Sequence, residues 1–139
     1  MNKTILVVDD DFQIRDSLRK VLQLEGYEVV LAADGREGTE LVQQEPVDLV
    51  LLDLNLPVQD GWETFERLTG MNPLLPIIMI TGRQNQVELA EAAGVGALMA
   101  KPLDVPQLLR KITELLAEDS ETRLTRLVGL DRTLHHQAA

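Results

Sequence analysis

Several features common in proteins are absent from this 139-residue chain, and each absence excludes a class of function. Cysteine is absent, so disulfides, thiolate metal sites and thiol nucleophiles are excluded, and any ligand or nucleophile must carry oxygen or nitrogen. No run of about 18 apolar residues occurs, so we expect no membrane-spanning helix. The polar start, Met1 to Lys3, leads directly into the short apolar run Ile5–Val8 and lacks a secretory hydrophobic region, so we expect a cytoplasmic protein.

Positive charge is also scarce. The chain has 13 Lys and Arg against 23 Asp and Glu, which gives a formal net charge of −10. Residues 119–139 hold three acids and three Arg, so the acidic excess lies in residues 1–118. Such a chain is not expected to bind nucleic-acid phosphates directly. Aromatic residues make up only 3% of the chain, but 45% of its residues are apolar, which is enough for the core of one domain.

Short apolar runs alternate five times with segments of helical period. The runs are too short for helices and are bounded by Asp, Gly or Pro, so we predict strands at Thr4–Val8, Glu28–Ala32, Leu49–Leu52, Ile77–Ile80 and Ala97–Ala100. The third and fourth runs are almost wholly apolar, which is typical of strands buried on both faces of a parallel sheet. Right-handed crossovers favour an α/β fold, a flavodoxin-like doubly wound five-stranded parallel sheet of order 2-1-3-4-5 with helices on both faces.

The first and last helices can be placed from their apolar stripes. The first follows Asp11, which is expected to cap it, and ends at Gly26. The last begins near Val105 and is expected to bury Leu108, Leu109, Ile112, Leu115 and Leu116. The tail after Glu118 carries apolar residues at helical spacing, so it is expected to extend the last helix.

Polar residues follow four of the five predicted strands at the point where each strand ends. They are Asp9, Asp10 and Asp11 after the first strand, Asp53 after the third, Thr81 after the fourth and Lys101 after the fifth. The carboxyl ends of parallel strands meet at one edge, beside the crevice where ligands bind. Taken singly, Asp11 can be a helix cap, and the others can begin loops or turns. Their coincidence at one edge favours a shared site.

The acidic residues of this edge indicate a metal ion. Adjacent carboxylates repel one another, and one helix cap does not require three of them. A hard, oxygen-seeking cation would remove that repulsion, and Mg²⁺ is the ion that is held by few carboxylates together with waters. The sequence therefore predicts Mg²⁺ among Asp9, Asp10 and Asp53.

In order and spacing these motifs resemble the receiver domain of two-component response regulators. The resemblance covers about residues 3–118 and rests on ILVVDD (Ile5–Asp10), DLVLLDLNLPVQDG (Asp48–Gly61), IIMITG (Ile77–Gly82) and AKPL (Ala100–Leu103). Each motif is short, but together they are highly specific. The resemblance implies a receiver domain over residues 1–118. Residues 119–139 are then a helical or disordered tail, or a linker to an output domain.

The resemblance also implies a role for each site residue. Asp53 would accept a phosphoryl group from the phosphohistidine of a sensor histidine kinase or a phosphotransfer protein. Asp10 and Asp53 would bind Mg²⁺ directly with the backbone carbonyl of Asn55, and Asp9 would bind it through a water.

Thr81 and Lys101 would contact the phosphoryl oxygens. Phosphoryl transfer requires mainly in-line positioning and neutralisation of charge on three equatorial oxygens, which an ammonium, a hydroxyl and Mg²⁺ can supply. The chain would then be a signalling phosphoacceptor rather than an enzyme with a separate substrate. It would assist its own phosphotransfer and autodephosphorylation.

One position departs from the family pattern. Three residues before Lys101, where the family usually has Tyr or Phe, this chain has Leu98, so the usual aromatic switch is missing. The resemblance implies signalling, and homodimerisation, through the face formed by the fourth helix, the fifth strand and the fifth helix. The helix expected between Gln84 and Ala93 has few apolar anchors and is expected to be the mobile element. The resemblance further implies a cis Lys101–Pro102 peptide.

Three other functions are weighed against this one. A flavodoxin would need a phosphate-binding loop after the first strand, where Asp9 to Asp11 would repel the phosphate of FMN. A haloacid-dehalogenase-type phosphatase also uses an aspartyl nucleophile with Mg²⁺, but its nucleophile follows the first strand, whereas Asp53 follows the third. A non-switching receiver, acting as a phosphate sink or a protein-interaction module, is the remaining alternative because of Leu98.

Overall fold

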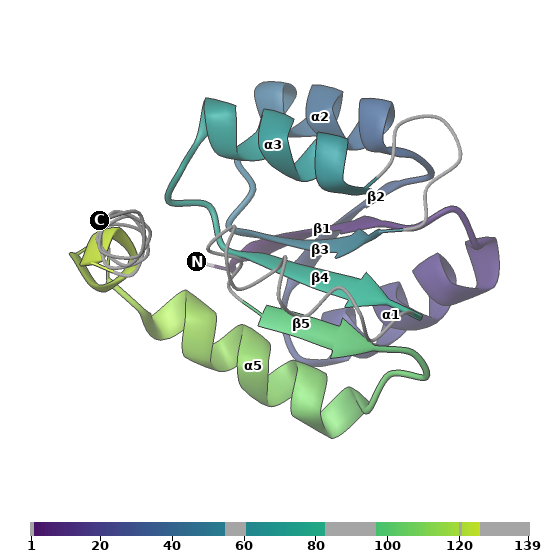
Figure 1. Cartoon of the computed structure of the whole chain (residues 1–139). Coiled ribbons are helices and arrows are strands. Elements are labelled where there is room, and N and C mark those ends of the chain that lie inside the picture. The colour runs from purple at the N-terminus through teal and green to yellow at the C-terminus, as the bar shows by residue number, and fades with distance from the viewer. Residues whose placement is uncertain (1, 55–60, 83–96, 120, 126–139) are drawn as a thin grey trace.

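Five parallel strands form one sheet in the computed structural model, which describes residues 2–54, 61–82, 97–119 and 121–125 (Figure 1). The strand order is β2-β1-β3-β4-β5, which confirms the predicted topology. The elements are β1 (Thr4–Val8), α1 (Phe12–Leu24), β2 (Glu28–Ala32), α2 (Gly35–Gln44), β3 (Leu49–Asp53), α3 (Gly61–Met71), β4 (Ile77–Thr81), β5 (Ala97–Ala100) and α5 (Val105–Ala117). Within the described residues, no helix combines the length and apolar character needed to cross a membrane.

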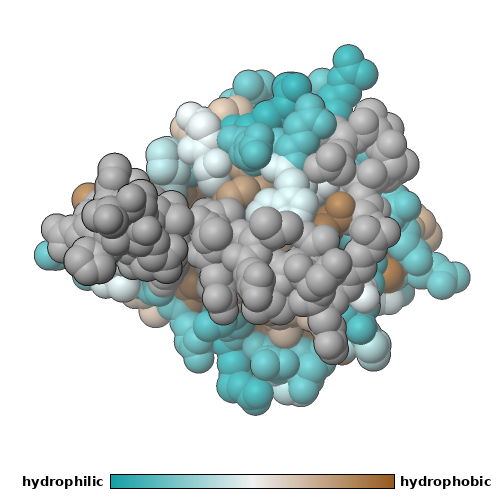
Figure 2. All heavy atoms as spheres, in the orientation of Figure 1, coloured by the Kyte–Doolittle hydropathy of each residue, from teal (hydrophilic) through white to brown (hydrophobic). Residues whose placement is uncertain are grey.

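The sheet lies between two helical layers, with α1 and α5 on one face and α2 and α3 on the other (Figure 1). Successive strand residues point to opposite faces, so Ile5 and Val7 pack toward α1 and α5, whereas Leu6 and Val8 pack toward α2 and α3. β3 and β4 are buried along their whole length, as predicted. Figure 2 shows that hydrophilic residues cover the outer surfaces of both helical layers on the visible face.

Strands β3 and β4 each extend one residue beyond their predicted ends. Asp53 pairs in register with Ile80, and Thr81 pairs with Ala100, so the polar residue that was expected to follow each strand is its last member. The ladder holds these two backbones in place, and their side chains are therefore presented from rigid positions.

The predicted cap at the start of α1 is confirmed, whereas the helix ends at Leu24 and its C-cap is Glu25, one residue before the predicted Gly26. Asp11 caps the helix by accepting a hydrogen bond from the backbone N–H of Gln13 at 2.8 Å. Gly26 has a φ of 93°, which favours glycine, and its N–H donates to the carbonyl oxygen of Gln23 at 3.0 Å.

The prediction that the tail extends the last helix is wrong as far as the structure describes the tail. α5 ends at Ala117, and Glu118 is extended, with φ −66° and ψ 138°. Residues 121–125 are helical again, after a break. The break occurs because Asp119 accepts a hydrogen bond from the N–H of Thr122 at 2.7 Å and so starts a new turn. In α5 itself, Leu108, Ile112 and Leu115 are buried as predicted, and Leu109 and Leu116 are partly buried.

α3 begins in direct contact with the end of β3. A Cβ atom at Gly61 would lie 2.3 Å from the Cα of Leu54 and 2.8 Å from the carbonyl oxygen of Asp53. The N–H of Gly61 also donates to the carbonyl oxygen of Leu54 at 3.1 Å. Because both clashes are with backbone atoms, only glycine permits this approach. The start of α3 is therefore fixed against the residue that carries the Asp53 carboxylate.

Candidate functional site

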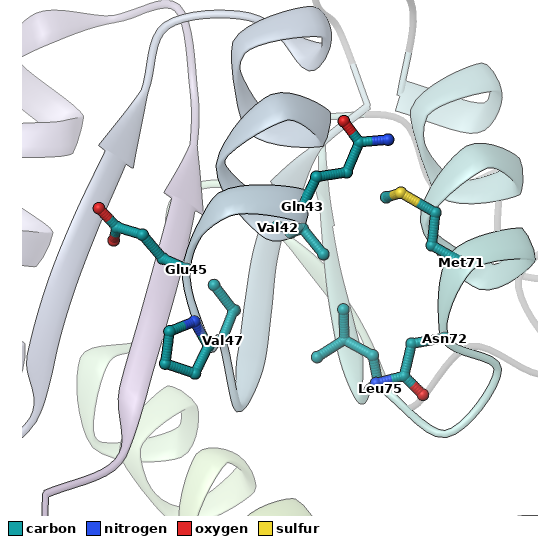
Figure 3. A pocket seen from close by; sticks show the side chains of 8 residues that line it. Val42, Gln43, Glu45, Val47, Met71, Asn72 and Leu75 are labelled. Carbon is teal, nitrogen blue, oxygen red and sulfur yellow. The ribbon is translucent and has the colours of Figure 1, made fainter.

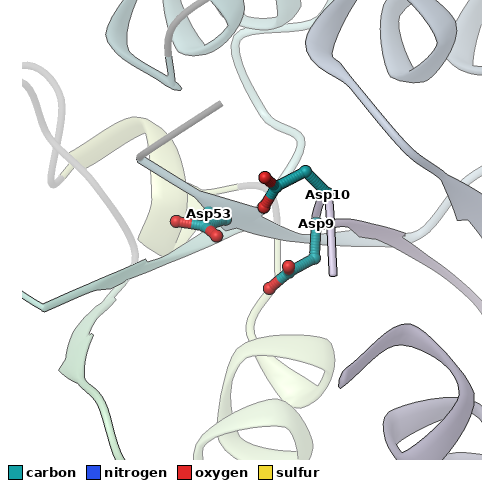
Figure 4. A group of neighbouring side chains, drawn as sticks. All are labelled: Asp9, Asp10 and Asp53. Atoms are coloured by element: carbon teal, nitrogen blue, oxygen red, sulfur yellow. The ribbon is translucent and has the colours of Figure 1, made fainter. Parts of the chain in front are cut away.

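The carboxyl-terminal edge of the sheet brings together the acidic residues that the sequence singled out. Asp9 and Asp10 follow β1, and Asp53 ends the neighbouring strand β3. One carboxylate oxygen from each of the three lies within 4.8 Å of the others, and Figure 4 shows the three side chains around one space. Asp9 and Asp53 are 2% and 1% exposed, whereas Asp10 is exposed. Two buried carboxylates and one exposed carboxylate thus form a single cluster.

Lys101 extends to this cluster from the end of β5. Its Nζ atom lies 3.0 Å from Oδ2 of Asp53 and 3.9 Å from Oδ2 of Asp9. Partial burial alone would lower the pKa of Lys101, but the hydrogen bond and charge of Asp53, helped by Asp9 and Asp10, outweigh burial and raise it. Lys101 is therefore held as an ammonium. The Lys101–Pro102 peptide is cis, as predicted.

Asp9 is the member of the cluster whose negative charge is poorly compensated. Its Oδ1 accepts a hydrogen bond from the N–H of Asp11 at 2.9 Å, but its buried Oδ2 has no hydrogen-bond partner. Burial raises the pKa of Asp9 from the ordinary value of 3.8 to about 6, and the negative charges of Asp53 and Asp10 add to this effect. The Asp11 N–H and the Lys101 charge act in the opposite direction. One lysine therefore does not compensate fully for three carboxylates.

These residues fit the predicted Mg²⁺ ion. The donors are all oxygens, they converge, and a buried carboxylate oxygen among like charges is left without a donor. A divalent cation would provide the charge that Lys101 alone does not. The fourth predicted ligand, the carbonyl of Asn55, lies outside the described residues.

Thr81 is at the same edge, as predicted. It is buried at the end of β4, one residue beyond the Ile80 that pairs with Asp53. Its carbonyl oxygen accepts a hydrogen bond from the N–H of Lys101 at 2.9 Å. The backbones of the hydroxyl residue and the lysine are therefore joined directly, at the ends of β4, which lies beside β3, and of β5, the next strand.

One residue of this edge, Arg15 in α1, had no signal in the sequence. Its Nη1 atom donates to the carbonyl oxygen of Asp9 at 2.6 Å, and its guanidinium carbon lies 5.8 Å from the centre of the Phe12 ring. The hydrogen bond holds the peptide that joins Asp9 to Asp10. A side chain that binds the backbone belongs to no charge or spacing motif, which is why sequence analysis missed it.

Two of the hollows lined by described residues lie at opposite edges of the sheet. One, of about 430 Å³, is beside the cluster, between α1 and the start of α5, and Lys101, Leu103 and Ile14 are in its wall. The other, of about 510 Å³, is at the amino-terminal edge between the ends of α2 and α3, where apolar side chains such as Val42 and Leu75 line it (Figure 3). Only the first adjoins ionisable groups that converge.

Comparison with known proteins identifies the family. The model of the response regulator receiver domain matches residues 5–113. A response regulator MprA from Mycolicibacterium vanbaalenii is 40% identical over 114 residues, which are 81% of this chain and 49% of that protein. MprA from Mycobacterium tuberculosis is 37% identical over 118 residues, 84% of this chain and 51% of that protein. The chain thus spans about half the length of these curated relatives.

Solved structures give the same result. A CheY-like response regulator receiver domain protein from Methanospirillum hungatei has a TM-score of 0.81 and 38% identity, covering 88% of this chain and 98% of that one. The response regulator TrrA from Thermotoga maritima, solved in complex with Mg²⁺ and BeF, has a TM-score of 0.75 and 32% identity, covering 81% and 98%. Both similarities extend over nearly all of the other chain.

Proposed function

This chain belongs to the family of response regulator receiver domains, and from that premise we propose that Asp53 is its phosphoacceptor. The observation that carries the proposal is the position of Asp53 at the end of β3, buried, 3.0 Å from the Lys101 ammonium and within a carboxylate cluster that fits a cation. The ladder holds the backbone of Asp53 in register, and the contact with Lys101 orients its carboxylate. A nucleophile for in-line transfer needs that fixed direction.

The reaction follows from the groups around Asp53. An Asp53 carboxylate oxygen attacks the phosphorus of a phosphohistidine, a P–O bond forms, the P–N bond breaks, and the imidazole leaves with its electron pair. Lys101, which is already at Asp53, then pairs with a phosphoryl oxygen, and the Thr81 hydroxyl donates a hydrogen bond to another. In autodephosphorylation, water attacks the same phosphorus, the P–O bond to Asp53 breaks, and inorganic phosphate and the free carboxylate are released.

The same residues would hold the metal ion. Asp10 and Asp53 would bind Mg²⁺ directly with the carbonyl of Asn55, and Asp9 would bind it through a water. When bound, Mg²⁺ neutralises charge on the transferring phosphoryl group. The buried Oδ2 of Asp9, which has no hydrogen-bond partner, supports this assignment. Calorimetry should show that Asp10→Ala loses Mg²⁺ binding, and unchanged affinity would refute the ligand role.

The partners follow from the family. We assign the phosphoryl donor to a sensor histidine kinase or a phosphotransfer protein in the cytoplasm, with the hollow beside Lys101 as its approach to Asp53. Output, including self-association, would use the face of the fourth helix, β5 and α5. The fourth helix lies outside the described residues. Leu98 in β5 is partly buried against the core beside α2 and α3. A change in the packing of Leu98 would therefore take the place of the rotamer change of the Tyr or Phe that the family usually has at this position.

The decisive experiment is phosphorylation by a small donor. With acetyl phosphate and Mg²⁺, the protein should gain one phosphoryl group, about 80 Da by intact mass. Asp53→Ala should gain none. Asp48→Ala is the matched control because Asp48 precedes the same strand at its opposite end, and this variant should be labelled like the wild type. Equal labelling of Asp53→Ala would refute the assignment.

A further inference from the structure

The chain after α5 returns to the body of the protein and is held there by one side chain. Arg123 is 19% exposed, and its Nη2 atom donates to the carbonyl oxygen of Leu115 at 2.9 Å. Its Nη1 atom donates to the carbonyl oxygen of Leu74 at 3.2 Å. The Nε atom of the same guanidinium lies 4.0 Å from Oε1 of Glu118.

These two carbonyls belong to different layers of the fold. Leu115 is in the last turn of α5, where its carbonyl oxygen also accepts a hydrogen bond from the N–H of Glu118 at 3.3 Å and where the helix dipole favours a cation. Leu74 is in the connection between α3 and β4, and α3 covers the opposite face of the sheet from α5. One planar guanidinium therefore joins both layers around the amino-terminal edge of the sheet.

The segment is built to present Arg123 inward. Asp119 accepts hydrogen bonds from the N–H of Thr122 at 2.7 Å and, through its carbonyl oxygen, from the N–H of Arg123 at 3.3 Å. The hydrogen bonds from Thr122 also lower the pKa of Asp119. The neighbouring Leu124 is 55% exposed, so burial of apolar surface by that residue does not hold the turn in place. The polar contacts of Arg123 and Asp119 do so.

We propose that residues 118, 119 and 121–125 form a strap, an interface that docks this segment on the body of the receiver, with the Leu74 and Leu115 carbonyls as its receptor and Arg123 as its anchor. The family model ends at residue 113 and so does not include the strap. Its consequence is mechanical. The chain leaves the receiver from a point fixed to α5 and to the α3–β4 connection together, rather than pivoting freely after α5.

Hydrogen exchange of the full chain tests the strap. In Arg123→Gln, the amides of residues 122–125 should exchange about 10-fold faster or more, because two hydrogen bonds from a charged donor are lost. Arg123→Lys should fall between, since one ammonium cannot reproduce the two-pronged contact. Exchange in β1 and phosphoryl labelling at Asp53 should not change. Arg110→Gln, which changes an exposed arginine of α5, is the matched control.

A second variant separates loss of the strap from loss of the fold. Asp119→Ala removes the start of the turn from an exposed position and should also release residues 122–125, with no change in exchange of β3. If neither Arg123→Gln nor Asp119→Ala speeds local exchange, the strap does not exist. If Arg123→Gln accelerates exchange throughout the domain and Asp119→Ala has no effect, Arg123 is a core contact and the proposal is wrong.

Discussion

The two edges of the sheet differ in how the charges of their side chains are balanced. At the amino-terminal edge, Asp48 accepts a hydrogen bond from the N–H of Thr4 at 2.7 Å, and Arg123 donates to two carbonyls. At the carboxyl-terminal edge, Asp9 keeps a buried carboxylate oxygen without a hydrogen-bond partner beside two further carboxylates. The amino-terminal edge also has a buried atom without a hydrogen-bond partner, Nε of Arg123, but that atom lies 4.0 Å from a carboxylate of opposite charge. At the carboxyl-terminal edge three carboxylates share one lysine, so their charge is compensated incompletely.

The difference shows which edge is shaped by stability and which by a ligand. Three carboxylates crowded around one lysine repel one another, so such a cluster is kept where a cation is to be bound. The rigid ladder of β3 and β4, and the core on both faces, allow the carboxyl-terminal edge to bear that cost. Matched substitutions, one at each edge, should therefore change the free energy of unfolding in opposite directions.

The largest contrast should come from two glycines of α3. Gly61→Ala, at the carboxyl-terminal edge, places a Cβ against two backbone atoms and should lower the free energy of unfolding by about 3 kcal/mol. Gly70→Ala, near the other end of the helix, meets no atom within 4 Å and should raise it by about 0.5–1 kcal/mol. Urea denaturation measures both. Equal effects of the two substitutions would show that the backbone of α3 does not pack closely against the end of β3.

The next contrast concerns the hydrogen bond from Arg15 that holds the peptide between Asp9 and Asp10. Arg15→Met should weaken Mg²⁺ binding about 10-fold by calorimetry, because the peptide between Asp9 and Asp10 loses its anchor. Arg19→Met is the control, since Arg19 pairs with Asp16 on the same helix. A tighter Mg²⁺ complex in Arg15→Met would mean that the charge of Arg15, not its hydrogen bond, governs the site.

Two conservative substitutions compare one acidic residue at each edge, Asp9 and Asp48. In metal-free protein at neutral pH, Asp9→Asn should raise the free energy of unfolding by about 1–2 kcal/mol because one of three crowded charges is removed. Asp48→Asn should lower it by about 0.5–1 kcal/mol, since a charged acceptor becomes a neutral one. Thermal denaturation in EDTA measures both. A destabilised Asp9→Asn would contradict the view that the carboxylates repel one another.

The smallest effect should be a pH dependence that belongs to Asp9. Its pKa is raised to about 6 from 3.8, so the folded state binds more protons than the unfolded state between these values. Asp9 therefore destabilises metal-free protein in full above about pH 6, and this contribution disappears as the pH falls toward 3.8. The stability difference between Asp9→Asn and wild type should shrink over that range. A difference that stays constant would show that Asp9 does not titrate in this way.

The sequence predicted the features that depend on hydrophobic periodicity and on the residues at which the strands end. The topology, the cap at Asp11 and the grouping of Asp9, Asp10 and Asp53 all follow from apolar runs that close on polar residues. The contacts of Arg15 and Arg123 could not be predicted in this way, because both bind backbone carbonyls and leave no pattern among side chains.

The close approach at Gly61 depends on the distance between two backbones, which a sequence does not record. The continuation of the tail as one helix was predicted wrongly for a related reason. Helical spacing of apolar residues continues past Ala117, but local hydrogen bonds of Asp119 override it and start a new turn. The roles of Asn55 and of the helix expected between Gln84 and Ala93 stay predictions.

The position of the strap has a practical consequence for handling the protein. β1 starts at the amino-terminal edge, and the strap ends there too, so both ends of the described chain emerge on the side away from Asp53 (Figure 1). An affinity tag, a fluorophore or a sensor surface attached directly at either end of the described chain, residue 2 or residue 125, would leave the acidic edge facing the solvent. A partner can therefore be presented to an immobilised receiver without the tether standing between them.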